Sequence, residues 1–155
     1  MNIRRADLTD IDALEKLNRE VQEIHIRNYP RIFKETSSEE VKSWFRSLFE
    51  EEDVYIFMAC EETDSVGYVI LRTLTHPENP FIYAVKIAYI DQICVTQSQR
   101  GRGVGRKLME HAIEHAVNLG FDRIELDVWH KNTNAREAFE KIGFKTSREK
   151  RTLDR

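Results

Sequence analysis

The sequence predicts a single α/β domain over residues 1–155, built on a mixed β-sheet with helices on both faces. A chain of 155 residues fits one domain and leaves no room for a second. Apolar residues make up 41% and charged residues 33%, a balance that is typical of soluble globular proteins. Segments with the period of strands and of helices follow one another in the order βααβββαβαβ, which predicts a sheet covered by helices.

The first half of the chain carries the signals of one strand, two helices and a strand hairpin. Apolar residues at 11–24 recur at steps of three and four, as on one face of a helix. Thr9 with Asp12 resembles a helix start, and Ser37 with Glu40 opens a second helix. We expect strands at 2–6, 54–60 and 66–74, and helices from 11 to 25 and from 37 onwards.

The second half begins with a long apolar stretch at 81–95, which holds one long strand or a bent one. Two glycines, Gly120 and Gly143, each follow a helical pattern and are expected to end it. Asn132 or Thr133 is expected to cap the second of these helices. We expect helices at 103–119 and 132–143, and strands at 123–129 and from 144 onwards.

Composition excludes several classes of protein. Lys plus Arg number 24 and Asp plus Glu 27, so a net charge of −3 argues against a dedicated nucleic-acid binder. The apolar runs are shorter than the roughly 20 residues that span a bilayer, and 1–12 lacks the apolar core of a signal peptide. Cys60 and Cys94 lie in apolar runs and are expected to be buried free thiols of a cytoplasmic protein.

We expect no metal site. His111 and His115 lie four residues apart on one helix face, and with Glu114 they fit a pattern of some zinc proteases. Both histidines, however, lie at the shoulder of an apolar helix face. Only 40 residues follow His115 to supply a third ligand.

The glycines are concentrated in a loop between a predicted strand and a predicted helix. Three of the six lie within five consecutive positions, and no Ser, Thr, Asp or Asn at 100–106 can cap the helix. Free N–H groups, the helix dipole and nearby Arg side chains together favour a bound phosphate or pyrophosphate. The residues of this glycine loop are Arg100, Gly101, Arg102, Gly103, Val104, Gly105 and Arg106.

Other interpretations of the glycine loop explain less. A flexible turn accounts for neither the clustered glycines nor the missing cap. A P-loop requires Gly-Lys and a hydroxyl residue, and a dinucleotide fingerprint requires a third glycine where Arg106 stands. Asp127 does end the next predicted strand, as a ribose-binding acid would, but too little chain follows for a dinucleotide-binding half.

The glycine loop resembles the Arg/Gln-x-x-Gly-x-Gly/Ala signature of the GNAT superfamily, the acetyl-CoA-dependent N-acetyltransferases. Arg100, Gly103 and Gly105 fill the signature positions. The stretches 89–95 and 120–129 resemble the fourth and fifth strands of that family, and the resemblance extends over nearly the whole chain. It implies a mostly antiparallel sheet whose fourth and fifth strands splay apart.

The resemblance also implies where acetyl-CoA binds. Backbone groups of Ile93, Cys94 and Val95 are expected to hold the pantetheine arm between the splayed strands, and one N–H polarises the thioester carbonyl. The glycine loop is expected to cradle the pyrophosphate. Asn132 and Phe139 fall in the segment that adjoins the cofactor in the family.

The implied reaction is direct attack of a neutral amine on the thioester. An alkyl ammonium has a pKa of about 10.4, so a base must first remove a proton. Asp91 matches an acidic position of the fourth strand and is the expected base, with a solvated or ion-paired role as the alternative. Phe139 replaces the Tyr that commonly donates a proton in the family, and we expect it to pack in the core. Tyr89 or Tyr83 then serves as the acid, or the thiolate leaves unaided.

The acceptor is expected to be a small-molecule or peptide amine, and its identity stays open. His25, Tyr29 and Phe33 fall in the region that lines the acceptor site in the family, although for His25 a helix-end histidine that covers the core is the favoured explanation. Family members often form homodimers, and the sequence itself leaves the oligomeric state open. Two other functions stay open at this point: an acyl-CoA-binding module with little or no turnover, prompted by Phe139, and a nucleotide-binding regulatory domain.

Overall fold

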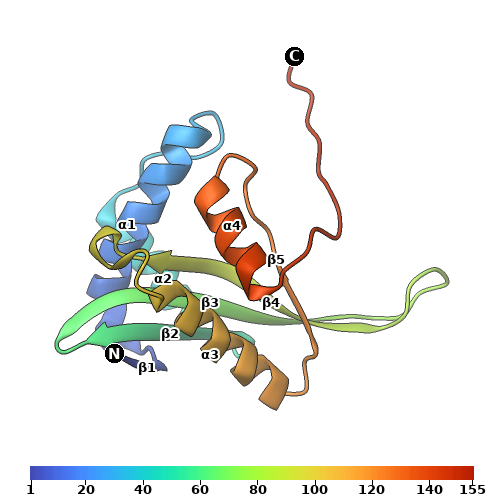
Figure 1. Cartoon of the computed structure of the whole chain (residues 1–155), viewed down its shortest axis with the longest axis horizontal. Helices are drawn as coiled ribbons and strands as arrows, with labels where there is room; N and C mark the ends of the chain where they lie inside the picture. Colours follow the sequence, from blue (N-terminus) through green and yellow to red (C-terminus); the bar gives the residue numbers. More distant parts are fainter.

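The computed structural model describes the whole chain, Met1–Arg155, and five of its segments form one β-sheet in chain order (Figure 1). Neighbouring strands from the first to the fourth are antiparallel, and the fifth runs parallel to the fourth. The prediction of a mixed, mostly antiparallel sheet is therefore confirmed. The strands are β1 (Asn2–Arg5), β2 (Val54–Glu61), β3 (Asp64–His76), β4 (Val85–Val95) and β5 (Arg123–Leu126).

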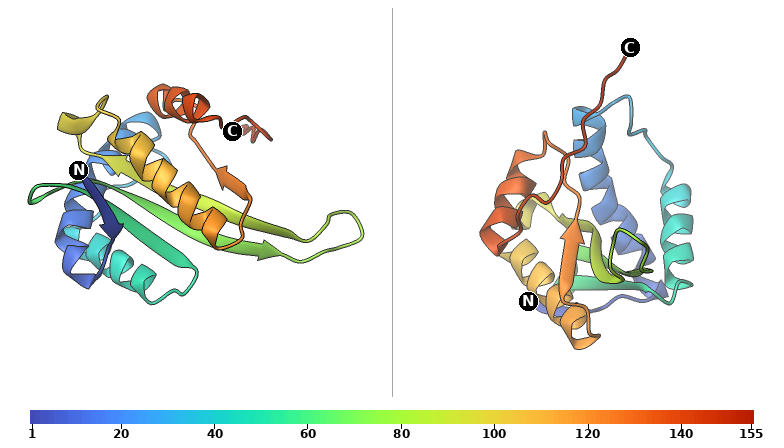
Figure 2. Two further views of the ribbon diagram at one scale, coloured as in Figure 1. Left: turned by 60° about the horizontal axis from the view of Figure 1, so that its bottom comes forward. Right: turned by 90° about the vertical axis from the view of Figure 1, so that its right-hand side faces the viewer.

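Helices cover both faces of this sheet, as predicted (Figure 2). One face carries a core formed by α1 and α2, and the other carries a core formed by α3, against which α4 also packs. No helix is both long enough and apolar enough to cross a membrane. The helices are α1 (Ile11–Asn28), α2 (Ser38–Phe49), α3 (Val104–Asn118) and α4 (Thr133–Ile142).

The central strand β3 is buried on both faces, and its side chains alternate between the two cores. Tyr68 and Ile70 pack with α1 and α2, whereas Val69 and Leu71 pack with α3. All four side chains are fully buried. This alternation is what the two-residue period of a strand produces when both faces are covered.

The start of α1 differs in detail from the prediction. Asp7 caps a short 3-10 turn, η1 (Leu8–Asp10), by accepting from the backbone N–H of Thr9 at 2.8 Å. The Asp10 carboxylate in turn accepts a hydrogen bond from the Asp7 N–H at 2.9 Å, so these two acids form the capping box. The second helix begins as expected, with Ser37 and Glu40 in a reciprocal capping box.

The C-terminal part of the sheet is shorter than predicted. The strand expected at 123–129 ends at Leu126, because the chain then turns away from β4 and carries Trp129 to α1. The last strand, expected from 144 onwards, does not form. Residues 145–155 are exposed and mostly charged, so they offer the sheet no alternating apolar face.

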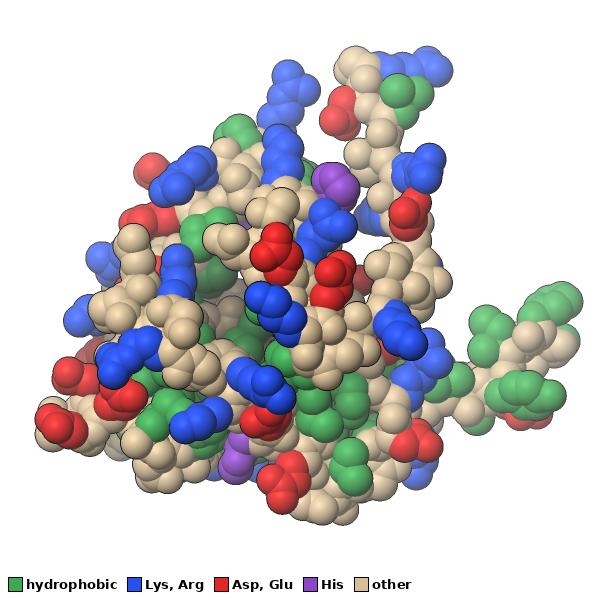
Figure 3. Space-filling view, in the orientation of Figure 1, with side chains coloured by type: hydrophobic (Ala, Val, Ile, Leu, Met, Phe, Trp, Pro, Cys, Tyr) green, Lys and Arg blue, Asp and Glu red, His purple; other side chains and the backbone are tan.

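The strands β3 and β4 continue beyond the rest of the sheet as a two-stranded arm (Figure 1). Their pairing runs from Gly67 opposite Val95 to His76 opposite Val85. The pairing of β3 with β2 extends only to Arg72, which lies opposite Val54, the first residue of β2. The tip of this arm, which the sequence assigned to the strand stretch at 81–95, is a loop. Phe81 and Tyr83 are 94% and 84% exposed there, and hydrophobic side chains cover the projecting tip (Figure 3).

Candidate functional site

The two halves of β4 have different neighbours. Its first half pairs with β5 from Ile87 opposite Arg123 to Ile90 opposite Leu126, and there the pairing stops. The strand continues to Val95 with β3 alone as a partner, so its last five residues leave one edge without a neighbouring strand. Backbone N–H and C=O groups on such an edge are available to a bound molecule.

The open half of β4 alternates between the two cores. Ile93 and Val95 pack against the core on the α3 side, whereas Cys94 is buried against α1, where its Sγ donates to the backbone oxygen of Leu17 at 3.0 Å. Burial raises the pKa of the Cys94 thiol to about 12, so the sulfur stays protonated. Both cysteines are free, as expected, with Cys94 buried and Cys60 only half-buried.

A β-bulge lies at the junction of the two halves. Ile90 is opposite Leu71 and Gln92 is opposite Ile70, which leaves Asp91 without a partner on β3. The Asp91 carboxylate instead accepts a hydrogen bond from Nε of Arg72 at 2.7 Å, and the same guanidinium binds Glu51 at 2.8 Å. The carboxylate thus lies at the point where β4 becomes open, held by an ion pair.

Tyr89 lies on the closed half of β4, opposite Glu125 of β5. Its hydroxyl donates a hydrogen bond to Asp127 at 2.9 Å and so joins β4 to the chain just beyond β5. Burial and the nearby Asp127 carboxylate raise the pKa of Tyr89 to about 12. The other candidate hydroxyl, Tyr83, lies at the tip of the arm, at the opposite end of the molecule from the glycine loop (Figure 1).

The glycine loop connects the open half of β4 to α3 through a short 3-10 turn, η2 (Gln97–Gln99). Gly103 is the N-cap of α3 with φ +81°, and Gly101 has φ +76°. A Cβ at either position would meet nothing within 4 Å, so the left-handed backbone conformation, and not crowding, requires glycine here. No side chain caps α3, as predicted, and its first N–H groups have no partner within the helix.

The three arginines of the glycine loop are exposed, and Arg100 forms an ion pair with Glu20 of α1 at 3.7 Å. Arg102 contacts Gln99 at 2.7 Å, Arg106 contacts Glu110 at 2.7 Å, and Arg100 donates to the backbone oxygen of Val95 at 3.0 Å. These are solvent-exposed contacts of the kind that contribute little to stability. Positive charge and free N–H groups therefore face the solvent together at the start of α3.

The segment after β5 carries the remaining residues of the predicted cofactor site. Asn132 caps α4, because its side-chain oxygen accepts from the Ala135 N–H at 3.4 Å. Phe139 is half-buried and packs against the α3-side core, with its ring 6.1 Å from that of Phe144. The expectation that Phe139 packs in the core is confirmed, and its side chain offers no proton.

The predicted acceptor residues form one aromatic cluster at the C-terminal end of α1. The His25 ring stacks on Phe33 at 4.6 Å, and Trp129 contacts Tyr29 at 4.6 Å and Phe33 at 5.3 Å. Nδ1 of His25 is buried without a partner, and burial lowers the pKa of this histidine. Tyr29 also accepts a hydrogen bond from the backbone N–H of Lys131 at 2.9 Å.

Trp129, which ends the strand expected at 123–129, is 39% exposed and contacts the aromatic cluster. Its place could not be found from periodicity, because it lies three residues beyond the end of β5. The cluster brings the end of α1 against the chain that follows β5. Residues more than 90 positions apart in the sequence thus form one cluster.

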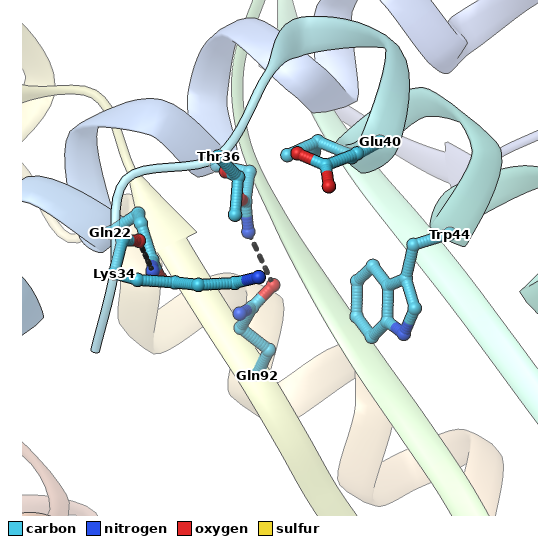
Figure 4. Close-up of a pocket in the computed structure, with 8 residues that line it drawn as sticks. Gln22, Lys34, Thr36, Glu40, Trp44 and Gln92 are labelled. Carbon is cyan, nitrogen blue, oxygen red and sulfur yellow. Dashed lines mark hydrogen bonds between the residues drawn. The ribbon is translucent and has the colours of Figure 1, made fainter. Parts of the chain in front are cut away.

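Sequence reasoning also missed a hollow of about 350 Å³ on the α1 and α2 side of the sheet, here named the α1–α2 hollow (Figure 4). Asn18 was the available signal, since it is a buried polar residue within the apolar face of α1. Its amide donates to the Tyr68 hydroxyl and to the Gln92 side-chain oxygen, both at 3.0 Å. The labelled lining residues are Gln22, Lys34, Thr36, Glu40, Trp44 and Gln92.

The paired histidines of α3 are used in packing. His111 and His115 lie edge-on to the Phe57 ring at 4.7 and 5.0 Å, and His115 also contacts Tyr55. Burial lowers the pKa of His115. No group of three His, Cys, Asp or Glu side chains is arranged to hold a metal ion.

Comparison with known proteins gives a consistent result. The model of the Acetyltransferase (GNAT) family matches residues 18–144 of this chain. An uncharacterized N-acetyltransferase of Archaeoglobus fulgidus is 29% identical over 143 residues, which cover 90% of this chain and 89% of that protein. The L-amino acid N-acetyltransferase AaaT of Escherichia coli is 28% identical over 146 residues, covering 92% and 81%.

Among solved structures, the tetramutant of the BH1408 protein from Bacillus halodurans superposes with a TM-score of 0.95. It is 26% identical in sequence, and the match covers 99% of both chains. The similarity therefore includes the full order of strands and helices described above.

Proposed function

This chain belongs to the acetyltransferase (GNAT) family and transfers an acetyl group from acetyl-CoA to an amine, and from this premise we propose that transfer takes place along the open half of β4. One observation carries the proposal. The pairing of β4 with β5 ends at Ile90, and the strand then leads directly into an uncapped helix start with two left-handed glycines. A free strand edge and an anion-binding helix start are therefore joined by one short loop.

The cofactor side of this site uses mainly backbone groups. The glycine loop supplies N–H donors and positive charge that suit a pyrophosphate, with Arg100, Arg102 and Arg106 around it. The edge of β4 at 93–95 supplies donors and acceptors that suit an amide-containing pantetheine arm. One N–H of this edge would stabilise the oxyanion that develops on the thioester carbonyl. Asn132 borders the site at the start of α4, and the half-buried Phe139 borders it from the face of α4 that packs against the α3-side core.

The base that we propose is Asp91. An amine acceptor is mostly an ammonium at neutral pH and must lose a proton before it attacks. The bulge places the Asp91 carboxylate where the open half begins, and Arg72 holds it in one orientation at 2.7 Å. The proton would pass to the carboxylate directly or through one water molecule.

For the leaving thiolate we propose no protein acid. Phe139 has no proton to donate, and Tyr89 has a pKa of about 12. A thiol similar to cysteine has a pKa of about 8.5, well below that of Tyr89, and the Tyr89 hydroxyl already donates its proton to Asp127. The thiolate therefore leaves unprotonated. Tyr89 acts as a positioning residue, whose bond to Asp127 holds β4 and the end of β5 together at the closed end of the site.

On the acceptor side, we propose that the aromatic cluster of His25, Tyr29, Phe33 and Trp129 forms one wall of the entry to the open half. A small-molecule or peptide amine is the acceptor. The stacked rings restrict the end of α1, and the Tyr29 bond to Lys131 ties it to the loop that follows β5.

Two further points of the proposal concern assembly and location. The apolar tip of the arm, where Phe81 and Tyr83 are almost fully exposed, supports a homodimer in which the tip packs on a second copy. The two unpaired thiols, Cys60 and Cys94, support a cytoplasmic location. Analytical ultracentrifugation of the wild type beside the double variant Phe81→Ser, Tyr83→Ser tests the assembly, and an unchanged dimer would contradict it.

The function itself is tested by release of free CoA from acetyl-CoA in the presence of a panel of amines. Release that depends on the amine and that rises with pH, as the ammonium loses its proton, is the expected result. Binding of acetyl-CoA without release of CoA by any amine would instead assign the chain to an acyl-CoA-binding module.

A further inference from the structure

The α1–α2 hollow contains a side-chain amide whose orientation is fixed from behind. The Gln92 oxygen accepts from the Asn18 amide at 3.0 Å and from the Tyr68 hydroxyl at 2.5 Å. Asn18 also donates to the Tyr68 oxygen at 3.0 Å, which closes a triangle of three buried or half-buried side chains. Both acceptor positions of the Gln92 oxygen are thereby used on the protein side.

This triangle determines what Gln92 presents to the hollow. With its oxygen turned towards Asn18 and Tyr68, the Gln92 amide nitrogen and its two N–H donors are left for the other side. A reversed amide would place two donors, those of Gln92 and Asn18, against each other. Gln92 lines the hollow, one residue from Asp91 and one from Ile93, and its two N–H donors have no partner in the protein.

A cation lies above this floor. Figure 4 shows the Lys34 side chain reaching across the hollow towards Gln92. The Lys34 ammonium forms no ion pair, and the only hydrogen bond to this residue is from Gln22 to its backbone oxygen, at 2.9 Å. Gln22 thus holds the chain from which Lys34 extends and leaves the ammonium free.

The one carboxylate in the hollow is already engaged. Glu40 accepts from the Ser37 backbone N–H at 2.9 Å in the capping box of α2, and this hydrogen bond lowers the pKa of Glu40. Its charge therefore serves the start of α2 and forms no direct ion pair with Lys34, although the Lys34 charge also contributes to the lowered pKa of Glu40. Thr36 adds a hydroxyl, and Trp44, which is 40% exposed, supplies an apolar wall.

From this arrangement we propose that the α1–α2 hollow binds an acceptor that carries a carboxylate beside its amine, an amino acid with an apolar or aromatic side chain. The Gln92 N–H groups and the Lys34 ammonium bind the carboxylate, and the side chain rests against Trp44. The amine then faces the open half of β4 next to Asp91. This inference rests on the proposed function and specifies its acceptor.

The test compares matched acceptors that differ only at the carboxylate. CoA release is measured with L-phenylalanine and L-leucine, with their carboxamides, and with 2-phenylethylamine and spermidine, at one ionic strength and saturating acetyl-CoA. For the wild type we expect kcat/KM to be at least tenfold higher for the amino acids than for their carboxamides.

Two variants assign this preference to the named groups. Lys34→Met removes the charge at similar length and should lower kcat/KM for the amino acids about tenfold, with less than a twofold effect on the carboxamides. Gln92→Glu keeps an oxygen for Asn18 and Tyr68 but replaces the donor with a negative oxygen, so it should lower kcat/KM for the amino acids about a hundredfold. Lys16→Met, at an exposed lysine of α1 outside the hollow, is the matched control and should change neither.

The outcomes separate this inference from the proposed function. Turnover of phenylethylamine or spermidine without turnover of the amino acids would overturn the inference and leave the acetyltransferase intact. An equal loss for amino acids and carboxamides in Lys34→Met would also overturn it, since a merely structural role of Lys34 has that effect. No CoA release with any amine would overturn the proposed function and the inference with it.

Discussion

The two halves of β4 belong to one strand but have different surroundings. The closed half, which reaches Ile90, has a strand on each side, and the open half, from Asp91 to Val95, has one only on the β3 side. The closed half thus has its backbone groups committed to the sheet, and the open half has an edge left for a ligand. The difference arises from the partner strand, since β5 ends at Leu126 while β4 continues.

The closed half should be the part on which stability depends most. Ile90 is 4% exposed and lies in the α3-side core, so Ile90→Ala should lower the free energy of unfolding by about 3 kcal/mol. Val95→Ala, at a half-buried position of the open half, should cost about 1 kcal/mol. Urea denaturation of both variants measures the two free energies of unfolding. Equal losses would mean that the closed half contributes no more to stability than the open half.

The open half should be the part on which turnover depends most. Asp91→Asn preserves the size and one acceptor for Arg72 but cannot take a proton, so kcat should fall about a hundredfold. The free energy of unfolding should change by less than about 1 kcal/mol, because the ion pair is partly exposed. Glu51→Gln removes the other carboxylate on the same guanidinium and serves as the control, with kcat within twofold of the wild type. Equal losses of kcat in both variants would indicate that the position of the Arg72 guanidinium, and not proton uptake by the Asp91 carboxylate, determines kcat.

The sequence predicted the closed half well and the open half only in part. The elements that were predicted correctly are defined by local signals. These signals are the regular alternation in β3 and β4 and the helix caps at Ser37 and Asn132. The end of β5 was missed because Trp129 is held by Tyr29 and Phe33, residues about 100 positions away. Its apolar character alone resembled a continuing strand.

The same distinction applies to the site. The glycine loop could be found because its signal, clustered glycines without a cap, is contained in seven consecutive residues. The α1–α2 hollow could not be found, since Asn18, Lys34 and Gln92 come from three separate elements and have no motif. The bulge at Asp91 is set by the pairing of β4 with β3, which a single strand does not encode.

The smallest effect that we predict concerns pH and the aromatic cluster beside the open half. Burial lowers the pKa of His25 in the folded chain, so the unfolded chain binds a proton more readily. Stability is therefore unaffected by this group above about pH 6.5 and falls as the pH drops below that value. His25→Gln should flatten part of the fall in Tm between pH 7 and pH 5, with the contribution of His115 remaining. The control is His76→Gln on the exposed arm, which should leave the slope unchanged, and an unchanged slope in His25→Gln would contradict the assignment.

The central claim, that the uncapped start of α3 next to the open half of β4 binds the pyrophosphate of acetyl-CoA, is tested most directly by calorimetric titration of two glycine variants. Gly103→Asp and Gly120→Asp place the same carboxylate at two left-handed glycines, with φ +81° and +88°, and a Cβ meets nothing within 4 Å at either. The backbone strain is therefore matched, and only Gly103 lies at the glycine loop. We predict that Gly103→Asp weakens acetyl-CoA binding at least a hundredfold while Gly120→Asp leaves it within threefold of the wild type. Equal affinities in the two variants would contradict the claim.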